Sequence, residues 1–560
     1  MTSEKKTHYE AIVIGAGVCG IYQIKRLVDM GMDATVLEAG GDLGGTWYFN
    51  RYPGCRFDSE SYTYGYTFDQ ELLDEWHWVE AYSPQPENLK YLNFVANKYD
   101  LRKHMQFNVF VQKAHWDESE NMWRLSLDDG RELTCRFLIM GLGLLSQPTM
   151  PKVPGIDDFK GQSFHTYYWP HEGVDLKGKR VAVIGTGATA IQVIGAIADE
   201  VGELKIFQRR PNWAAPLNNY RIDEAKMDEI RSRYDEIFAN CAKSPGGFEH
   251  QPDRRGFWEV TREERLKLWD RLYDEPGFGI WLQNFREIFT DEKANAEFSE
   301  YIADRIRQRV NDPVVAEKLI PRDHGFGVQR VPLETNYYEA YNRDNVELID
   351  LNETPLKQIT EKGIMTSDDV EREFDIIVYA TGFDAITGAY DHIDIRGTGG
   401  QNLKEKWDEG GIQTYLGMFI HGFPNMFLPA GPQSGSASTN YPRGIETGVN
   451  WVSDMLEHVQ ERGYTRVEAS EEAEKEWTEH VVSMYSVMLM RKAKSWFTGY
   501  NSNVAGHEAG KPRYLVYNGG APKYVQRIKQ VAGAGYEGIE MSSGEAFAAA
   551  LNAQRVGAGD

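Results

Sequence analysis

The sequence predicts an α/β fold made of two Rossmann-like dinucleotide-binding domains with a helical insertion. The first observation is a glycine turn, GAGVCG (15–20), that follows an apolar run (9–14) typical of a buried parallel strand. The second is a similar turn, GTGATA (185–190), after the apolar run 179–184. The third is a highly charged, helix-periodic stretch from about 221 to 320. The two turns start 170 residues apart, too far for one Rossmann unit, so we expect two nucleotide sites.

Composition excludes several classes of function. The 560 residues include 61 Lys+Arg and 84 Asp+Glu, and the net charge of −23 would repel nucleic-acid phosphates. No apolar run approaches the roughly 20 residues of a membrane helix, and the first ten residues lack the apolar core of a signal peptide. The four cysteines form no CxxC pair, which argues against a disulfide framework, a metal site or a dithiol redox centre. We therefore expect a cytoplasmic protein, monomeric or a small homo-oligomer, without nucleic-acid or membrane partners.

Other segments complete the predicted order of elements. Apolar runs at 34–38, 203–207 and 374–382 are typical of further buried strands. A helix is expected near 451–461, and the last residues (546–560) have the pattern of a helix that frays into a tail.

The first glycine turn has the residues that a dinucleotide requires. Gly15, Gly17 and Gly20 suit the tight turn, the close approach of a pyrophosphate and close helix packing. Glu38 ends the next strand 23 residues after Gly15, where a carboxylate accepts hydrogen bonds from ribose hydroxyls and repels a 2′-phosphate. This site should bind FAD or NAD.

The second turn has the opposite charge at the matching strand end. Gly185 and Gly187 are present, and Ala190 stands in the third glycine position. Arg209 and Arg210 occupy the place that Glu38 has in the first unit, and arginine suits a 2′-phosphate, although adjacent arginines can also be a solvated surface pair. A site for FAD and a site for NADP indicate a pyridine-nucleotide flavoprotein. Because there is no dithiol, we expect oxygen to receive the electrons.

Two longer motifs indicate a family. FKGQSFHTYYWP (159–170) matches FxGxxxHxxxW[P/D] at Phe159, Gly161, His165, Trp169 and Pro170. GGTWYFNRYPGCRFD (44–58) gives a second match, at Gly44, Gly45, Trp47, Tyr52, Pro53, Gly54 and Asp58. From about residue 9 to residue 520 the chain closely resembles the type I Baeyer–Villiger monooxygenases, which are class B flavin-dependent monooxygenases.

The resemblance implies a domain organisation and a reaction. It implies an FAD domain (1–145 and 384–560), an NADP domain (146–216 and 326–383) and a helical insertion (217–325). In this family NADPH reduces FAD, O2 forms a peroxide at carbon 4a of the flavin, and an oxygen atom is inserted next to a ketone carbonyl to give an ester or lactone.

The resemblance also implies site residues. The family's active-site arginine falls on Arg330 and its partner carboxylate on Asp58, and a fixed cation suits the anionic oxygens of this reaction. His165 lies in the family's linker between domains, and we expect a hydrogen-bonding role there rather than a catalytic one.

Further positions correspond to cofactor and substrate contacts in the family. The flavin side comprises Thr46, Trp47, Tyr48, Phe49, Tyr64, Val111 and Tyr441, and the nicotinamide side comprises Arg56, Phe57, Asp58 and Arg330. NADP phosphates and ribose are assigned to Thr186, Thr189, Ala190, Gln192, Arg209, Arg210 and Gln329, and Trp496 belongs to a mobile loop that closes over NADP. The small residues Ser436, Ala437 and Ser438 should border the substrate.

The chain departs from the family pattern at three places. Gln329 stands where relatives often have a basic residue, and we hypothesise that Arg210, often Thr in relatives, supplies the missing charge. Met140–Gly143 replaces an Ala-Thr-Gly type turn, with little expected effect, whereas Ala380–Gly382 is intact. Residues 501–510 lengthen the loop beyond Trp496.

Two other enzyme activities and one non-catalytic role compete with ketone oxygenation. They are an N- or S-oxygenating flavin monooxygenase, an NADPH oxidase that releases hydrogen peroxide, and a dinucleotide sensor. Trp169, Asp58 and Arg330 favour ketone oxygenation.

Overall fold

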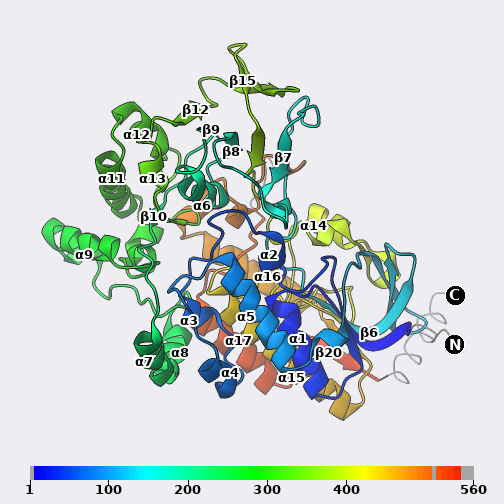
Figure 1. Cartoon of the computed structure of the whole chain (residues 1–560). Helices are drawn as coiled ribbons and strands as arrows, with labels where there is room; N and C mark the ends of the chain where they lie inside the picture. The colour runs from blue at the N-terminus through cyan, green and yellow to red at the C-terminus, as the bar shows by residue number, and fades with distance from the viewer. Residues whose placement is uncertain (1–5, 508–512, 544–560) are drawn as a thin grey trace.

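The computed structural model describes residues 6–507 and 513–543 (Figure 1). The helix and tail expected at 546–560, and part of the 501–510 insert, lie outside the described residues. Two sheets with parallel cores carry the two glycine turns, and helices pack around them. The α/β class with two Rossmann-like units is thereby confirmed. The residue limits of the three domains stay a prediction.

The first sheet is built from both halves of the chain. β1 (His8–Ile14) lies between β2 (Ala34–Leu37) and β6 (Glu132–Met140) and runs parallel to both. The order is β17-β4-β5-β6-β1-β2-β3, and β18 also pairs with β6. The remaining strands are β3 (Met105–Gln106), β4 (Val111–Asp117), β5 (Met122–Leu127), β17 (Asp394–Arg396) and β18 (Met426–Phe427).

The second sheet has five parallel strands in the order β12-β9-β8-β16-β7. They are β7 (Gln162–His165), β8 (Arg180–Ile184), β9 (Glu203–Gln208), β12 (Val346–Asp350) and β16 (Ile376–Tyr379). β16 is shorter than the strand expected at 374–382, because the chain turns away at Gly382, whose φ of +83° favours glycine. Strands β13 (Leu356–Ile359), β14 (Gly363–Thr366) and β15 (Glu371–Glu373) form a separate antiparallel sheet.

The longest helix differs from the prediction. α15 runs from Tyr441 to Arg462 and so begins ten residues before the expected start at 451. Pro442 is tolerated because it lies in the first turn of the helix. Gly444 and Gly448 weaken the helical pattern of the sequence, but both are needed for close packing. A Cβ on Gly444 would lie 2.5 Å from the Cα of Ser436, and one on Gly448 only 1.8 Å from the carbonyl oxygen of Pro429.

The other long helices outside the 221–320 stretch come from several parts of the chain. α1 (Val18–Asp29) packs along α15, and the Gln23 amide donates to the Ser453 hydroxyl at 3.1 Å. The rest are α5 (Gln85–Lys98), α6 (Ala188–Ile197), α14 (Leu403–Gly410), α16 (Glu471–Tyr485) and α17 (Ala521–Gly533). β19 (Arg466–Ala469) pairs with β20 (Ile539–Ser542). Figure 1 shows α1, α5, α15 and α17 side by side below the second sheet.

The stretch from 221 to 320 is helical, as expected. It contains α7 (Glu224–Ser232), α8 (Tyr234–Lys243), α9 (Arg262–Asp274), α11 (Glu292–Arg309) and α12 (Pro313–Leu319). β10 (Ala215–Pro216) and β11 (Leu333–Glu334) pair where the chain leaves and re-enters this stretch. In Figure 1, α9, α11 and α12 lie to the left of the second sheet, whereas α7 and α8 lie below it, near α17.

A buried ion pair fastens the helical stretch to the segment of the first glycine unit that follows Asp58. The Nε2 atom of His250 lies 2.7 Å from Oε1 of Glu60, and both side chains are at most 10% exposed. Burial opposes both charges, but the Glu60 charge raises the pKa of His250, and His250 keeps the pKa of Glu60 below its usual value.

Gly20→Ala should destabilise the protein severely. A Cβ on this first-turn residue of α1 would lie 1.8 Å from the carbonyl oxygen of Gly15, which backbone movement alone can relieve. We expect a loss of at least about 2 kcal/mol, measured as a lower midpoint of thermal unfolding. Gly533→Ala is the control, because its Cβ would meet nothing within 4 Å. A wild-type midpoint for Gly20→Ala would contradict the packing argument.

His250→Gln should remove a pH-dependent part of the stability. A raised histidine pKa contributes fully below the unfolded value of 6.5, and that contribution disappears as pH rises through the folded value. A lowered Glu60 pKa contributes above 4.5 and loses its effect as pH falls through the folded value. The difference in unfolding midpoint between wild type and variant should therefore be largest between about pH 4.5 and 6.5. A difference that stays constant from pH 5 to 9 would contradict this.

Candidate active site

The first glycine turn is closed by backbone contacts. Gly15 has a φ of +100°, and a Cβ there would lie 2.6 Å from the carbonyl oxygen of Gly141. Gly17 precedes α1, so the free N–H groups of that helix face the turn. Glu38 is buried and accepts hydrogen bonds from the N–H groups of Ala16 and Gly40, both at 2.6 Å. Burial raises the pKa of Glu38 despite these bonds.

An aromatic cluster follows this turn in the chain. Thr46, Trp47, Tyr48 and Phe49 form the short helix α2 (Thr46–Phe49). The Trp47 indole N–H donates to the Tyr64 hydroxyl at 2.8 Å, and the Phe57 and Tyr64 rings stack with centroids 4.1 Å apart. Tyr441, at the start of α15, has a buried hydroxyl without a partner among the described residues. The structure thus brings Trp47, Phe57 and Tyr64 into one apolar wall.

Val111 lies near Glu38 in the first unit. It begins β4, two residues after Val109, whose N–H donates to the Glu38 carbonyl at 2.9 Å. The structure therefore places Val111 in the segment that runs beside Glu38 rather than with the aromatic cluster.

The structure brings together Asp58 and Arg330, 272 positions apart in the chain. The Arg330 Nη2 atom donates to Oδ2 of Asp58 at 2.8 Å, and the Leu333 N–H donates to the same oxygen at 3.2 Å. The Asp58 side chain is 1% exposed and that of Arg330 is 34% exposed. The Nη1 atom of Arg330 and the Oδ1 atom of Asp58 have no hydrogen-bond partner in the described part of the chain. The pair therefore has one donor and one acceptor still available.

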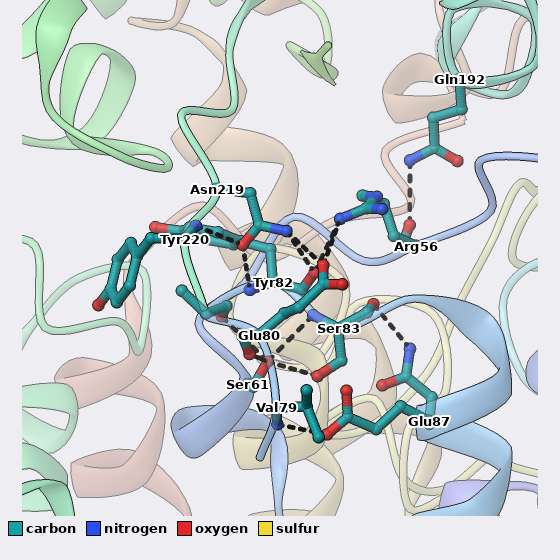
Figure 2. Close-up of polar contacts among 12 residues, drawn as sticks. Arg56, Ser61, Val79, Glu80, Tyr82, Ser83, Glu87, Gln192, Asn219 and Tyr220 are labelled. Atoms are coloured by element: carbon teal, nitrogen blue, oxygen red, sulfur yellow. Dashed lines mark hydrogen bonds and ion pairs between the residues drawn. The ribbon is translucent and has the colours of Figure 1, made fainter. Parts of the chain in front are cut away.

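Polar contacts fix the segment that carries Asp58 (Figure 2). Arg56 donates from Nη1 to Oε2 of Glu80 and to the Tyr82 carbonyl, each at 3.1 Å, and Asn219 donates to the same Glu80 oxygen at 2.6 Å. The Gln192 amide of α6 donates to the Arg56 carbonyl at 3.0 Å. Asp58 is thus positioned by contacts from α6 and from the entrance to the helical stretch. The Arg56 guanidinium is bound to Glu80 in this structure. Its predicted contact with a cofactor stays a prediction.

The second glycine turn repeats the geometry of the first. Gly185 has a φ of +114°, and its Cβ would lie 2.5 Å from the Ala380 carbonyl oxygen. Gly187 precedes α6 and borders open space, because its Cβ would meet nothing within 4 Å. Thr189, Ala190 and Gln192 lie in the first turns of α6, with Ala190 fully buried.

The two arginines after β9 have different surroundings. Arg209 is exposed, and no ion pair forms with it among the described residues. The Arg210 guanidinium pairs with Asp323 and donates to the Lys494 carbonyl at 3.3 Å, while the Thr186 hydroxyl donates to the Arg210 carbonyl at 2.8 Å. Residue 494 belongs to the segment that carries Trp496, so the structure brings that segment to the second turn. The sequence did not predict a role for Asp323. Its position six residues before Gln329 was the one signal that could have pointed to it.

The remaining predicted residues lie just before α15 or just before Arg330 in the chain. Ser436 is buried, Ala437 and Ser438 are half-buried, and the Ser438 hydroxyl donates to the Tyr517 carbonyl. Gln329 has a buried Nε2 atom without a partner among residues 6–507 and 513–543.

His165 ends β7 and lies apart from the Asp58–Arg330 pair. Its Nδ1 accepts from the Tyr167 N–H and its Nε2 donates to the Gly382 carbonyl, both at 3.1 Å. Burial lowers its pKa to about 4, so it is a neutral, hydrogen-bonded residue.

These features fit the two expected cofactors. Each turn presents glycines and a helix N-terminus, which suit a pyrophosphate. Buried polar atoms without a partner, at Asp58, Gln329, Arg330 and Tyr441, lie on the residues expected to contact them, and such atoms cost free energy until a ligand satisfies them. Among the described residues there is no cluster of His, Cys, Asp or Glu that could hold a metal ion. In the same part of the chain, no helix is long and apolar enough to cross a membrane.

Comparisons with known proteins agree with this site. Residues 8–218 match the family described as flavin-binding monooxygenase-like. A Pseudomonas putida protein named 2-oxo-Δ3-4,5,5-trimethylcyclopentenylacetyl-CoA monooxygenase is 45% identical over 96% of this chain and 99% of that protein. A Lysobacter antibioticus phenazine N-monooxygenase is 36% identical over 97% of this chain and 99% of that protein.

A solved structure of OTEMO in complex with FAD and NADP superposes with a TM-score of 0.91 at 44% identity, covering 96% of this chain and 100% of that one. The likeness extends over almost the full length of the chain. The chain belongs to the Baeyer–Villiger monooxygenases, a family of flavin-binding monooxygenases.

Proposed function

We propose that this protein is an NADPH-dependent Baeyer–Villiger monooxygenase that binds FAD and converts a ketone, O2, NADPH and a proton into an ester or lactone, water and NADP⁺. The observation that carries the proposal is the Asp58–Arg330 pair, with its free Nη1 donor and its bond between segments far apart in the chain. Family membership and the fit of both glycine turns support the choice of cofactors.

When bound, reduced FAD supplies the chemistry that activates O2 for insertion next to the carbonyl. Arg330 stays protonated and offers a fixed positive charge and a free N–H to the anionic oxygens of the reaction. Asp58 orients the guanidinium through Nη2 and is itself held by the Leu333 N–H. The wall of Trp47, Phe57 and Tyr64 excludes water, which strengthens this electrostatic stabilisation.

The second glycine turn supports NADPH rather than NADH. Arg209 and Arg210 follow β9 at the strand end where an acidic residue would repel the 2′-phosphate. The Nε2 donor of Gln329 also has no partner in the described part of the chain. We infer that Arg209 and Arg210 together supply the charge that Gln329 lacks.

N-oxygenation is the second candidate, because one relative is named a phenazine N-monooxygenase. A soft aromatic nitrogen would accept oxygen without the tetrahedral oxyanion that Arg330 is placed to stabilise. Product identity separates the two candidates: an ester gains its oxygen between carbons, whereas an N-oxide does not.

Location and assembly are also part of the proposal. The four cysteines are free thiols and all are buried, which suits a reducing cytoplasm. We propose a monomer or small homo-oligomer, to be measured by sedimentation.

Arg330→Ala should abolish ester formation while FAD binding persists. Removing the charge leaves the anionic oxygens without their stabilising cation, and we expect at least about a 100-fold loss in the rate of ester formation. Product mass after incubation with NADPH and ketones of increasing ring size gives the rate, and flavin absorbance gives the occupancy. Arg180→Ala, which breaks a surface pair with Asp375, is the matched control. Native ester yield in Arg330→Ala would refute the proposal, and hydrogen peroxide as the sole product of wild type would favour an oxidase.

Arg210→Thr should weaken the preference for NADPH. The loss of one guanidinium near the 2′-phosphate is expected to reduce the ratio of kcat/KM for NADPH over NADH about tenfold. Steady-state oxidation of each cofactor with saturating ketone measures the ratio. An unchanged ratio would show that Arg210 does not read the phosphate.

A further inference from the structure

Arg210 lies at a junction of three segments. Its backbone follows β9, its Nη2 pairs with Asp323 on the segment after α12, and its Nη1 donates to the Lys494 carbonyl at 3.3 Å. Because the guanidinium has a fixed fork of donors, both sides of the fork are already used within the protein.

Asp323 is held on its other side as well. Its Oδ1 lies 2.7 Å from Nδ1 of His324, whose side chain is only 3% exposed. The hydrogen bond with His324 and the charge of Arg210 keep the pKa of Asp323 well below its usual value. The carboxylate is therefore a permanent negative charge beside Arg210.

Besides these two partners, the carboxylate borders open space. Asp323 and His324 border a cavity of about 380 Å³ that is also lined by Trp213 and Lys492, and the Asp323 side chain is 48% exposed. Replacing the carboxylate by an amide of the same shape should thus change the charge without changing the packing.

Arg209 provides the contrast. It is exposed and makes no ion pair among the described residues, so its guanidinium is available to an incoming phosphate without the loss of an internal contact. A phosphate dianion must therefore compete with an internal ion pair to bind Arg210, but not to bind Arg209.

We propose that Asp323 is a specificity-determining residue that weakens recognition of the 2′-phosphate by occupying Arg210. This inference rests on the proposed NADPH site. A phosphate dianion that binds Arg210 must share or displace the ion pair and must approach a second negative charge, and both effects reduce its affinity. The Lys494 carbonyl is bound to the same guanidinium, so the exchange also alters the anchorage of the Trp496 segment.

Calorimetric titration of the FAD-loaded enzyme with 2′,5′-ADP and with 5′-AMP tests the proposal. Asp323→Asn should tighten 2′,5′-ADP binding roughly 3- to 10-fold at low salt and leave 5′-AMP binding unchanged. In the Arg210→Thr background the same substitution should have a smaller effect, because no ion pair is left to release. Asp344→Asn, the same charge change at an exposed residue just before β12, should leave both affinities unchanged.

The outcomes separate this inference from the function on which it rests. Unchanged or weaker 2′,5′-ADP binding in Asp323→Asn, with clear discrimination between the two nucleotides in wild type, would overturn the role of Asp323 alone. An equal effect in the Asp344→Asn control would overturn it too, by assigning the change to net charge. A wild type that does not discriminate 2′,5′-ADP from 5′-AMP would overturn both the proposed NADPH site and the inference.

Discussion

The ion pair between Asp58 and Arg330 is the constraint on which the site depends. A carboxylate that is 1% exposed is costly to bury unless a cation and hydrogen bonds satisfy it, and here Arg330 and the Leu333 N–H share one of its oxygens. Each partner comes from a different part of the chain. The pair therefore forms only when the first glycine unit and the segment before β11 are correctly placed against each other. The free Nη1 donor then exists because only one arm of the guanidinium is used.

The surrounding contacts explain how the segment that carries Asp58 keeps its position. On one side of Asp58, the Arg56 carbonyl is held by Gln192 of α6, and the Arg56 guanidinium is held by Glu80, which Asn219 also contacts (Figure 2). On the other side, Glu60 pairs with His250 of the helical stretch. Three parts of the molecule thus meet within the residues 56–60. A shift of any one of them would change the position of Asp58, and with it the direction of the Arg330 guanidinium.

Sequence reasoning found what depends on local sterics and on long motifs. The glycine turns were predictable because the turn itself requires glycine: Gly15 and Gly185 have positive φ, and Gly20 packs against the Gly15 carbonyl oxygen. The close approach of Gly141 and Ala380, from far along the chain, adds a constraint that only the structure shows. Asp58 and Arg330 were expected from the motifs, and the structure brings them together. Asp323 and His250 were not expected, because their roles arise from partners more than 100 positions away, at Arg210 and Glu60. The early start of α15 was hidden by Gly444 and Gly448, which weaken a helix locally but permit its packing.

A comparison of the two glycine turns shows which part of the motif sets the nucleotide. Met140–Gly143 departs from the Ala-Thr-Gly pattern that Ala380–Gly382 retains, yet the carbonyl oxygens of Gly141 and Ala380 occupy the same place, 2.6 and 2.5 Å from the Cβ positions of Gly15 and Gly185. The contact is made by the backbone in both turns, although Gly141 itself has little room for a side chain, since its Cβ would lie 2.9 Å from the Ile14 carbonyl oxygen. The turns therefore provide a common pyrophosphate cradle, and the choice between nucleotides falls to the strand ends. At one end the buried Glu38 is held by two N–H groups. At the other, Arg209 makes no ion pair with any residue that the structure describes, and Arg210 is restrained by a carboxylate. In a chain with net charge −23, the strength of phosphate binding thus depends on how far each arginine is already neutralised from within.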